Sequence, residues 1–178
     1  MYSLEKFTKD IPVEEYIKGY VDVPKFVEYC KVCPNYNHKW SCPPYDFAPV
    51  DYWKKFNTLK LVCYKMTFEN EDNAEKLDVM YKVKSTMLEE LLKMEDEIPN
   101  SITLSAGSCN NCGENNCAKL SDKPCRFPKS MRFSIEALGG DVVKTAKDLF
   151  GIDIRWAEGE DTLPYLILMG GLLSAKND

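Results

Sequence analysis

The chain has 178 residues, of which 44% are hydrophobic and 29% charged, the composition of a globular domain with its own core. Its formal net charge of -5 argues against a nucleic-acid partner, because nucleic-acid-binding proteins present basic surfaces. No apolar stretch reaches the length of a membrane-spanning helix, and the first residues lack the basic and apolar regions of a signal peptide. We therefore expect a single cytoplasmic domain over residues 1–178, with no membrane partner.

Residues 1–57 are aromatic and punctuated by proline, and we expect them to be irregular apart from short helices. Two such helices are expected at residues 14–20 and 23–30. The prolines that follow forbid regular structure as far as residue 49. Asp51 is then expected to be the N-cap of a short helix that ends at residue 56.

Residues 58–68 are rich in β-branched and aromatic residues, with apolar side chains at both odd and even positions. This pattern predicts a central strand that is covered on both faces. Asp72 and Glu75 have the spacing of a capping box and predict the start of a long helix. Its expected apolar stripe, at steps of three and four residues, is Leu77, Met80, Val83, Met87, Leu91, Met94 and Ile98.

Alternation over residues 101–106 predicts a second strand, which leads into a cysteine-rich loop. Beyond that loop we expect a short helix capped by Ser134 and a second helix that begins after Asp141 and ends before Gly151. A final strand pair is expected at residues 152–156 and 163–169, joined by a turn at 158–161.

This order of elements predicts an α/β or α+β fold, with helices packed on a small central sheet. We expect residues 58–178 to form the sheet-and-helix core. The cysteine-rich loop at 107–128 would be inserted into that core, and an irregular metal-binding lobe would carry the cysteines.

Seven of the eight cysteines fall into two groups, and we expect both to bind metal. The first group, here called the triad, is Cys30, Cys33 and Cys42, and the second, the tetrad, is Cys109, Cys112, Cys117 and Cys125. A reducing cytoplasm disfavours disulfides, so thiols gathered in this way are typical of metal or redox sites. Each group begins with Cys-x2-Cys, a spacing that directs both sulfurs at one metal centre in iron–sulfur and zinc sites alike.

The remaining spacing favours 4Fe–4S clusters, one or two per chain, with zinc as the alternative. A zinc ribbon usually supplies a second Cys-x2-Cys pair, and neither group has one. The uneven spacing of the tetrad resembles cubane-binding sequences, and proline next to a cysteine, as at Cys33-Pro34, is similar to the Cys-Pro of bacterial ferredoxins. The asparagines and Gly113 within the tetrad suit a loop that wraps around a cluster and directs N–H groups at its sulfurs.

The triad is one ligand short of a closed site. Three cysteines can hold a four-iron cluster with one iron open, and an open iron can bind a substrate or a sulfur atom. The fourth ligand could instead be His38, the only histidine of the chain, or Cys63 in the predicted central strand. For both residues there is a simpler alternative, a solvated loop histidine and a small buried core residue.

The residues around the two groups favour electron transfer or other redox chemistry. Arg126, Lys129 and Arg132 follow the tetrad and would stabilise an anionic cluster or attract an acidic redox partner, unless they are ordinary solvated charges. The aromatic residues near the triad are expected to shield it from water: Trp40, Tyr45, Phe47, Tyr52 and Trp53. The alternatives are a redox or sulfur-transferring enzyme that uses an open iron, and a zinc-stabilised binding module without a redox role.

The two motifs together resemble the predicted metal-binding protein family, domain of unknown function 2284, which is found mostly in anaerobic bacteria and archaea. The matching residues are Cys30, Cys33, Trp40, Cys42, Pro43 and Pro44, followed by Cys109, Cys112, Cys117, Pro124, Cys125, Arg126, Pro128, Arg132, Ser134, Glu136 and Ala137. Phe133 stands where the family pattern has proline, which leaves the cysteines unaffected. The resemblance implies a metal but no particular reaction.

Overall fold

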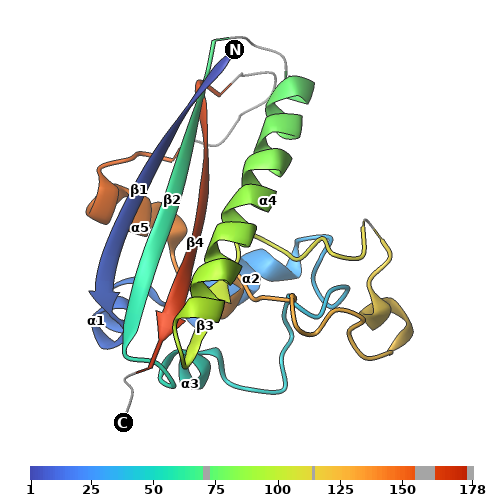
Figure 1. The fold of residues 1–178 in the computed structure, drawn as a ribbon. Helices are drawn as coiled ribbons and strands as arrows, with labels where there is room; N and C mark the ends of the chain where they lie inside the picture. The colour runs from blue at the N-terminus through green and yellow to red at the C-terminus, as the bar shows by residue number, and fades with distance from the viewer. Residues whose placement is uncertain (70–72, 114, 155–162, 176–178) are drawn as a thin grey trace.

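The computed structural model describes residues 1–69, 73–113, 115–154 and 163–175, and their centre is a four-stranded antiparallel sheet (Figure 1). Its strands are β1 (Tyr2–Pro12), β2 (Thr58–Phe68), β3 (Ser101–Leu104) and β4 (Tyr165–Ser174), and they lie in the order β1-β2-β4-β3. Every neighbouring pair is antiparallel, which makes the fold a mixed α/β structure of the α+β kind. Among these residues no helix has the length and apolar character that crossing a bilayer requires.

Helices cover both faces of the sheet. They are α1 (Val13–Tyr20), α2 (Val23–Lys31), α3 (Pro49–Trp53), α4 (Asn73–Glu97) and α5 (Val142–Phe150), with short 3-10 helices η1 (Ala118–Ser121) and η2 (Glu136–Leu138). Along β2, Leu59 and Leu61 pack in one core with residues of α1, α3 and α5, whereas Val62 and Met66 pack in a second core beneath α4. The prediction of a central strand covered on both faces is confirmed.

Strand β1 corrects the expectation that residues 1–57 are irregular outside short helices. It pairs with β2 along all 11 of its residues, at the edge of the sheet. Only Ile11 among them is buried, and Phe7 is partly buried against the same core. The backbone hydrogen bonds to β2 hold this edge strand in place. Its side chains therefore need not alternate between apolar and polar, which is the pattern from which strands are predicted.

The predicted helices at 14–20 and 23–30 are confirmed as α1 and α2. The next helix, α3, begins earlier than expected and ends at Trp53 instead of residue 56, and Asp51 lies in its first turn instead of at the N-cap, which is Ala48. Pro49 occupies the first helical position, where its fixed φ and missing N–H are tolerated.

The buried line of α4 runs through Val79, Val83, Met87 and Leu91, in steps of four residues. The predicted stripe was therefore right in its middle and wrong at its ends, since Leu77 is 49% exposed and Ile98 36%. The predicted cap Asp72 lies outside the described residues.

The C-terminal strand differs most from its prediction. Residues 152–154 are not a strand, and Ile152 is instead buried in the core that contains α5; residues 155–156 and the expected turn lie outside the described residues. Strand β4 continues past residue 169 to Ser174 and lies between β2 and β3. It contains Gly170 and Gly171, whose low strand propensity hides this extension in the sequence.

Substitution of Gly170 by alanine is expected to destabilise the fold by about 1–3 kcal/mol, because an added Cβ meets backbone that cannot move cheaply. That Cβ would lie 2.7 Å from the carbonyl oxygen of Leu104 in β3. Gly19 in α1 is the matched control, since a Cβ there has nothing within 4 Å and alanine favours helix. Urea unfolding measures both variants, and equal stabilities of Gly170→Ala and Gly19→Ala would contradict the steric explanation.

The predicted cap and end of α5 are confirmed. The Asp141 side chain accepts a hydrogen bond from the backbone N–H of Lys144 (2.8 Å), and α5 ends at Gly151 with φ of 69°. The short helix expected after Ser134 is η2, but its N-cap is Ile135; the Ser134 hydroxyl, one residue earlier, accepts from the N–H of Ala137 at 3.2 Å. These caps matter for function because η2 borders the triad.

Candidate metal centres

The three cysteines of the triad line one pocket of about 170 Å³. Cys30 lies in the last turn of α2, and the N–H of Cys33 donates to its carbonyl oxygen at 3.0 Å, so both thiols project from one tight turn. Cys42 returns to them after a loop and is buried, whereas Cys33 is exposed. The structure thus brings the triad together at a site that is open to solvent on one side.

Burial and neighbouring thiols raise the pKa of two cysteines of the triad. Burial and the nearby Cys42 and Cys33 raise the pKa of Cys30 to about 11, and burial likewise raises the pKa of Cys42. Three adjacent thiolates repel one another and are poorly solvated, so their ionised forms need a positive charge close by. A bound metal supplies that charge, and its binding would release the protons.

The four cysteines of the tetrad line a separate, smaller pocket, of about 20 Å³. Residues with positive φ give their loop its sharp turns: Gly113 (76°), Asn115 (49°) and Asp122 (52°). Burial raises the pKa of Cys109, and the charges of Cys125 and Cys112 add to this, while the backbone N–H of Asn111 lowers it. That N–H is directed at the Cys109 sulfur, as the loop composition predicts.

The two pockets share a wall. Ser41 lines the tetrad pocket, and its neighbour Cys42 lines the triad pocket. Likewise, Cys109 lines the tetrad pocket and its neighbour Ser108 lines the triad pocket. The N–H of Cys109 donates to the Ser41 hydroxyl at 3.0 Å, which joins the two dipeptides directly. Two centres bound here would therefore lie on opposite sides of the backbone at residues 41–42 and 108–109.

The cations at this wall are not the ones predicted. The Lys39 ammonium donates to the Ser108 hydroxyl (3.3 Å) and to the carbonyl oxygen of Cys109 (3.0 Å), and Lys119 donates to the carbonyl oxygen of Cys42 at 3.4 Å. The sequence analysis assigned a role to neither lysine: Lys39 is 70 residues from Cys109, and Lys119 lies within the tetrad loop.

Of the predicted cations, two make structural contacts away from this wall and one is exposed to solvent. Arg132 is paired with Glu95 of α4 and is thereby engaged in holding the loop. Arg126 donates to the backbone carbonyl of Asn116 within the tetrad loop. Lys129 is exposed, consistent with the alternative of a solvated charge.

Neither predicted fourth ligand lines the triad pocket. The His38 ring Nδ1 is hydrogen-bonded to the carbonyl oxygen of Pro34 at 2.8 Å, and the ring is exposed. Cys63 is fully buried in the core of the sheet, where burial raises its pKa to about 12. The alternative of a small core residue is the one that fits Cys63.

Glu136, at the start of η2, lines the triad pocket. Its Oε2 is buried and has no hydrogen-bond partner among the described residues. Burial raises the pKa of this carboxyl, and its own backbone N–H, the Ser134 hydroxyl and the charge of Lys84 offset that only in part. Sequence reasoning gave Glu136 no role beyond its place in the second motif.

The aromatic residues after the triad are divided between two places. Tyr45, Phe47 and Tyr52 pack against Phe133 with ring centroids 4.8–5.6 Å apart, and the Tyr45 hydroxyl donates to the carbonyl oxygen of Ser41 at 2.8 Å. These rings pack against the core, in which Trp53 is buried, and none of the four residues lines the triad pocket, so the shielding of the triad stays a prediction.

Trp40 belongs with the tetrad instead. It lines the tetrad pocket, and its indole N–H donates to the carbonyl oxygen of Lys123 at 3.0 Å. The Lys119 ammonium lies 5.3 Å from the centre of its ring, a cation–π contact. The indole therefore links the first cysteine segment to the loop of the tetrad.

As the side chains lie, the described residues contain no group of three or more His, Cys, Asp or Glu that could hold a single metal ion. A single zinc ion needs all its sulfurs at about 2.3 Å. In a four-iron cluster each iron takes one thiolate, so the sulfurs surround a larger body. The donors present, seven thiols in two pockets, are of the type that such a cluster binds.

Comparison with known proteins matches residues 17–173 to a family described as "Predicted metal-binding protein (DUF2284)". The matched range contains both cysteine groups and Glu136. No curated protein and no solved structure matches the chain.

Proposed function

The chain belongs to the DUF2284 family of predicted metal-binding proteins, and we propose that it is an iron–sulfur protein with two four-iron centres that pass electrons. The observation that carries this proposal is the division of seven cysteines between two adjoining pockets, three in one and four in the other. Bound clusters would supply one-electron redox chemistry. The cysteines would bind the clusters, and the residues around them would exclude water and set the net charge of each site.

The shared wall favours electron exchange between the two centres. Ser41 and Cys109 are hydrogen-bonded across it, and Lys39 donates to Cys109 from the same side. Hydrogen bonds and cations next to a thiolate-bound cluster stabilise its reduced, more negative form and raise its potential. Lys39 and Lys119 would in this way tune both centres.

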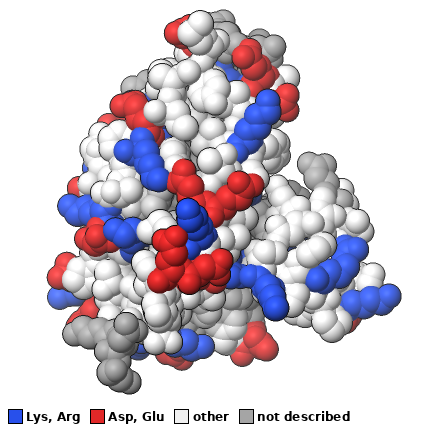
Figure 2. All heavy atoms as spheres, viewed as in Figure 1, with Lys and Arg blue, Asp and Glu red and all other residues white. Residues whose placement is uncertain are grey.

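We further propose an acidic protein as the redox partner. On the face shown in Figure 2, basic side chains predominate over the cysteine-bearing loops, whereas the sheet and α4 display both signs of charge. Lys123, Arg126 and Lys129 are exposed on the tetrad loop. A basic patch beside a redox centre would steer an acidic partner toward it, and raising the salt concentration would slow that association.

Anaerobic purification followed by metal and sulfide analysis tests the function directly. We expect a brown protein with about eight irons and about eight sulfides per chain, from two four-iron clusters. Its visible absorption should bleach on reduction with dithionite. A colourless protein that carries stoichiometric zinc and no iron would overturn the proposal.

The volume of the tetrad pocket favours a second candidate, zinc at the tetrad alone. About 20 Å³ is room for roughly one water molecule, which suits a single ion better than a cluster unless the loop opens. The same metal analysis separates the candidates, because this one predicts about four irons and about one zinc per chain.

A larger cavity beside the triad supports the enzyme alternative. It measures about 550 Å³ and shares Asn35, Gly107, Ser108 and Glu136 with the triad pocket. A small molecule in this cavity would reach a metal centre of the triad. If the triad centre has an open iron, small thiols or anions should change its electron paramagnetic resonance spectrum while that of the tetrad centre stays constant.

A further inference from the structure

The triad pocket contains one strong donor that is not a cysteine. Glu136 lines the pocket together with Cys30, Cys33 and Cys42. Its Oε2 is buried without a hydrogen-bond partner among the described residues. A buried carboxylate oxygen with nothing bound to it is costly, so its presence at this position calls for a cation or a donor.

Glu136 and Cys30 lie on two helices, η2 and α2, that are hydrogen-bonded to each other. The N–H of Asp22, the N-cap of α2, donates to the carbonyl oxygen of Gly139 at 2.8 Å, which fastens the N-terminal end of α2 to η2. The last turn of α2 carries Cys30. A Cβ at Gly139 would lie 2.7 Å from the Val23 side chain, so this contact has no room for a larger residue.

Residues on both sides of Glu136 are anchored in the core. Ile135 and Leu138 are fully buried, and the Trp53 indole N–H donates to the carbonyl oxygen of Leu138 at 3.0 Å. The backbone on both sides of Glu136 is therefore fixed. Its carboxylate reaches the pocket from a rigid support, as the geometry of a metal ligand demands.

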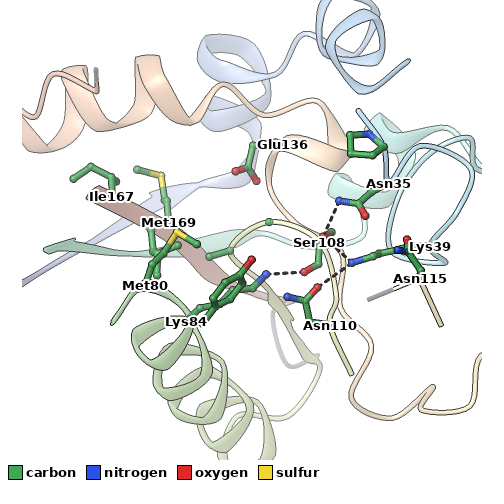
Figure 3. A pocket seen from close by; sticks show the side chains of 15 residues that line it. Asn35, Lys39, Met80, Lys84, Ser108, Asn110, Asn115, Glu136, Ile167 and Met169 are labelled. Atoms are coloured by element: carbon green, nitrogen blue, oxygen red, sulfur yellow. Dashed lines mark hydrogen bonds between the residues drawn. The ribbon is translucent and has the colours of Figure 1, made fainter. Parts of the chain in front are cut away.

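The nearby lysines do not neutralise this carboxylate by contact. Lys84 donates to the carbonyl oxygen of Ser108 at 2.7 Å, and Lys39 to Ser108, Cys109 and Asn110. Figure 3 shows these contacts grouped around Ser108, with the Glu136 carboxylate directed into the same cavity from the other side. No ion pair joins Glu136 to a lysine among the described residues.

We propose that Glu136 supplies the fourth donor of the metal centre held by the triad. This inference rests on the proposed function, in that it needs a metal at the triad, but it does not depend on which metal is bound. Carboxylate oxygen ligates both iron and zinc, and it is held less firmly by a soft metal site than a thiolate is. The metal position that Glu136 ligates would therefore be the exchangeable one.

The position of Glu136 also determines where a substrate would bind. Glu136 lines both the triad pocket and the cavity of about 550 Å³. A small anion that enters this cavity would meet Lys39 and Lys84 and could replace the carboxylate at the metal. Glu136 thus closes the triad at rest and leaves the site accessible from one side.

Substitution Glu136→Gln tests the inference, with His38→Gln and Cys63→Ala as matched controls for the two ligands predicted from the sequence. Each protein is purified without oxygen and analysed for metal, sulfide and electron paramagnetic resonance. We expect Glu136→Gln to lose about one iron per chain as Fe2+, and to show a three-iron signal after one-electron oxidation with added ferricyanide. Both controls should keep the metal content of the unmodified protein. Glu136→Cys, which restores a donor, should recover the lost iron.

The outcomes separate this inference from the proposed function. Unchanged metal content and spectra in both Glu136→Gln and Glu136→Cys would overturn the role of Glu136 and leave the iron–sulfur proposal standing. If the unmodified protein carries zinc at the triad and Glu136→Gln loses it, the donor role stands and the iron–sulfur proposal fails. Recovery in Glu136→Cys excludes general misfolding as the cause of a loss.

Discussion

Substitution Cys125→Ser is expected to abolish the tetrad centre and to leave the triad centre in place. Cys125 lines only the smaller pocket, and none of the three triad cysteines lines it. A serine hydroxyl is a hard and weakly acidic donor, so it replaces a thiolate poorly at iron or zinc. With two clusters in the unmodified protein, iron and sulfide content should fall by about half, from about eight to about four per chain.

The same substitution should loosen the loop of the tetrad. Among the described residues of 107–133 no side chain is buried, and their regular structure is limited to η1. Bound metal would therefore contribute much of the order of this segment, as it does in small metal-binding domains. Hydrogen exchange should be faster in residues 107–128 of Cys125→Ser and unchanged in β2.

Cys33→Ser is the reciprocal control, because it should remove the triad centre and spare the tetrad centre. Loss of both centres in either variant would contradict the independence of the two ligand sets. It would instead show that the hydrogen bond from Cys109 to Ser41 couples the two sites so tightly that neither forms alone.

The parts of the fold that are predictable from the sequence are those set by local patterns. Strand β2 has apolar residues on both faces because a helix layer lies on each side of it. The Asp141 cap and Gly151 terminus of α5 depend on residues within one turn of the helix. The grouping of the cysteines follows for the same reason, since within each group they are close in the sequence. Metal ligation itself remains a prediction.

The parts that were missed depend on distant partners. Strand β1 forms because its backbone pairs with that of β2. Strand β4 needs glycine at 170 and 171, because the carbonyl oxygens of Leu104 and Lys60 lie close to where the side chains of larger residues would be. Glu136 could not be assigned for a similar reason. It is about 100 residues from Cys30 in the sequence and joins the triad only through the packing of η2 on α2.

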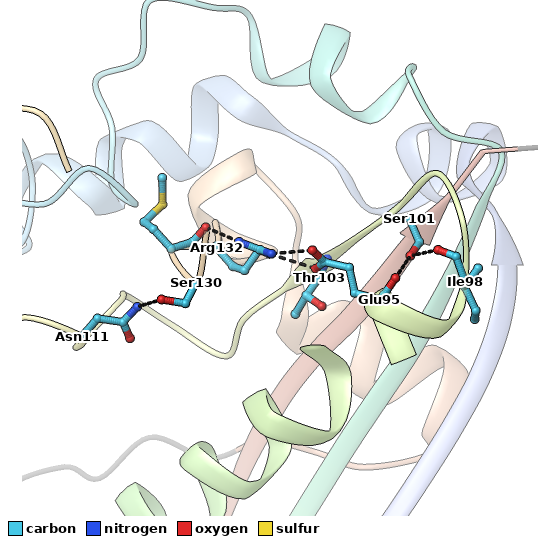
Figure 4. A network of polar contacts seen from close by, with 8 residues as sticks. Glu95, Ile98, Ser101, Thr103, Asn111, Ser130 and Arg132 are labelled. Atoms are coloured by element: carbon cyan, nitrogen blue, oxygen red, sulfur yellow. Dashed lines mark hydrogen bonds and ion pairs between the residues drawn. The ribbon is translucent and has the colours of Figure 1, made fainter. Parts of the chain in front are cut away.

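Substitution Arg132→Met is expected to destabilise the protein by about 1–3 kcal/mol, because it leaves the largely buried Glu95 carboxylate without its cation. The two side chains are 10% and 17% exposed, and the Arg132 Nε donates to Glu95 Oε2 at 2.9 Å. The backbone N–H of Thr103 donates to the same oxygen at 2.7 Å, so the pair joins α4, β3 and the end of the tetrad loop (Figure 4). Lys31→Met is the control.

Lys31 pairs with Glu28 on the surface of α2, where the two side chains are 50% and 68% exposed. Such a pair contributes at most about 1 kcal/mol, so Lys31→Met should change the free energy of unfolding little. Urea unfolding of the two variants at neutral pH makes the comparison. Similar losses in both would show that Glu95 is well solvated after all, and that burial of this pair does not matter.

The pH dependence of stability gives an independent test of the same pair. Burial alone would raise the pKa of Glu95, but the hydrogen bonds from Arg132 and from the N–H of Thr103 outweigh it and lower the pKa below its ordinary value of 4.5. The unfolded chain therefore takes up this proton at higher pH than the folded one, and the pair's stabilisation is complete above about pH 4.5 and is lost as the pH falls through the folded pKa. Glu95→Gln should lower stability at neutral pH yet flatten its decline below pH 4.5. If the variant and the unmodified protein lose stability with the same slope in acid, Glu95 does not titrate with a lowered pKa, and Arg132 fastens the tetrad loop to α4 by packing alone.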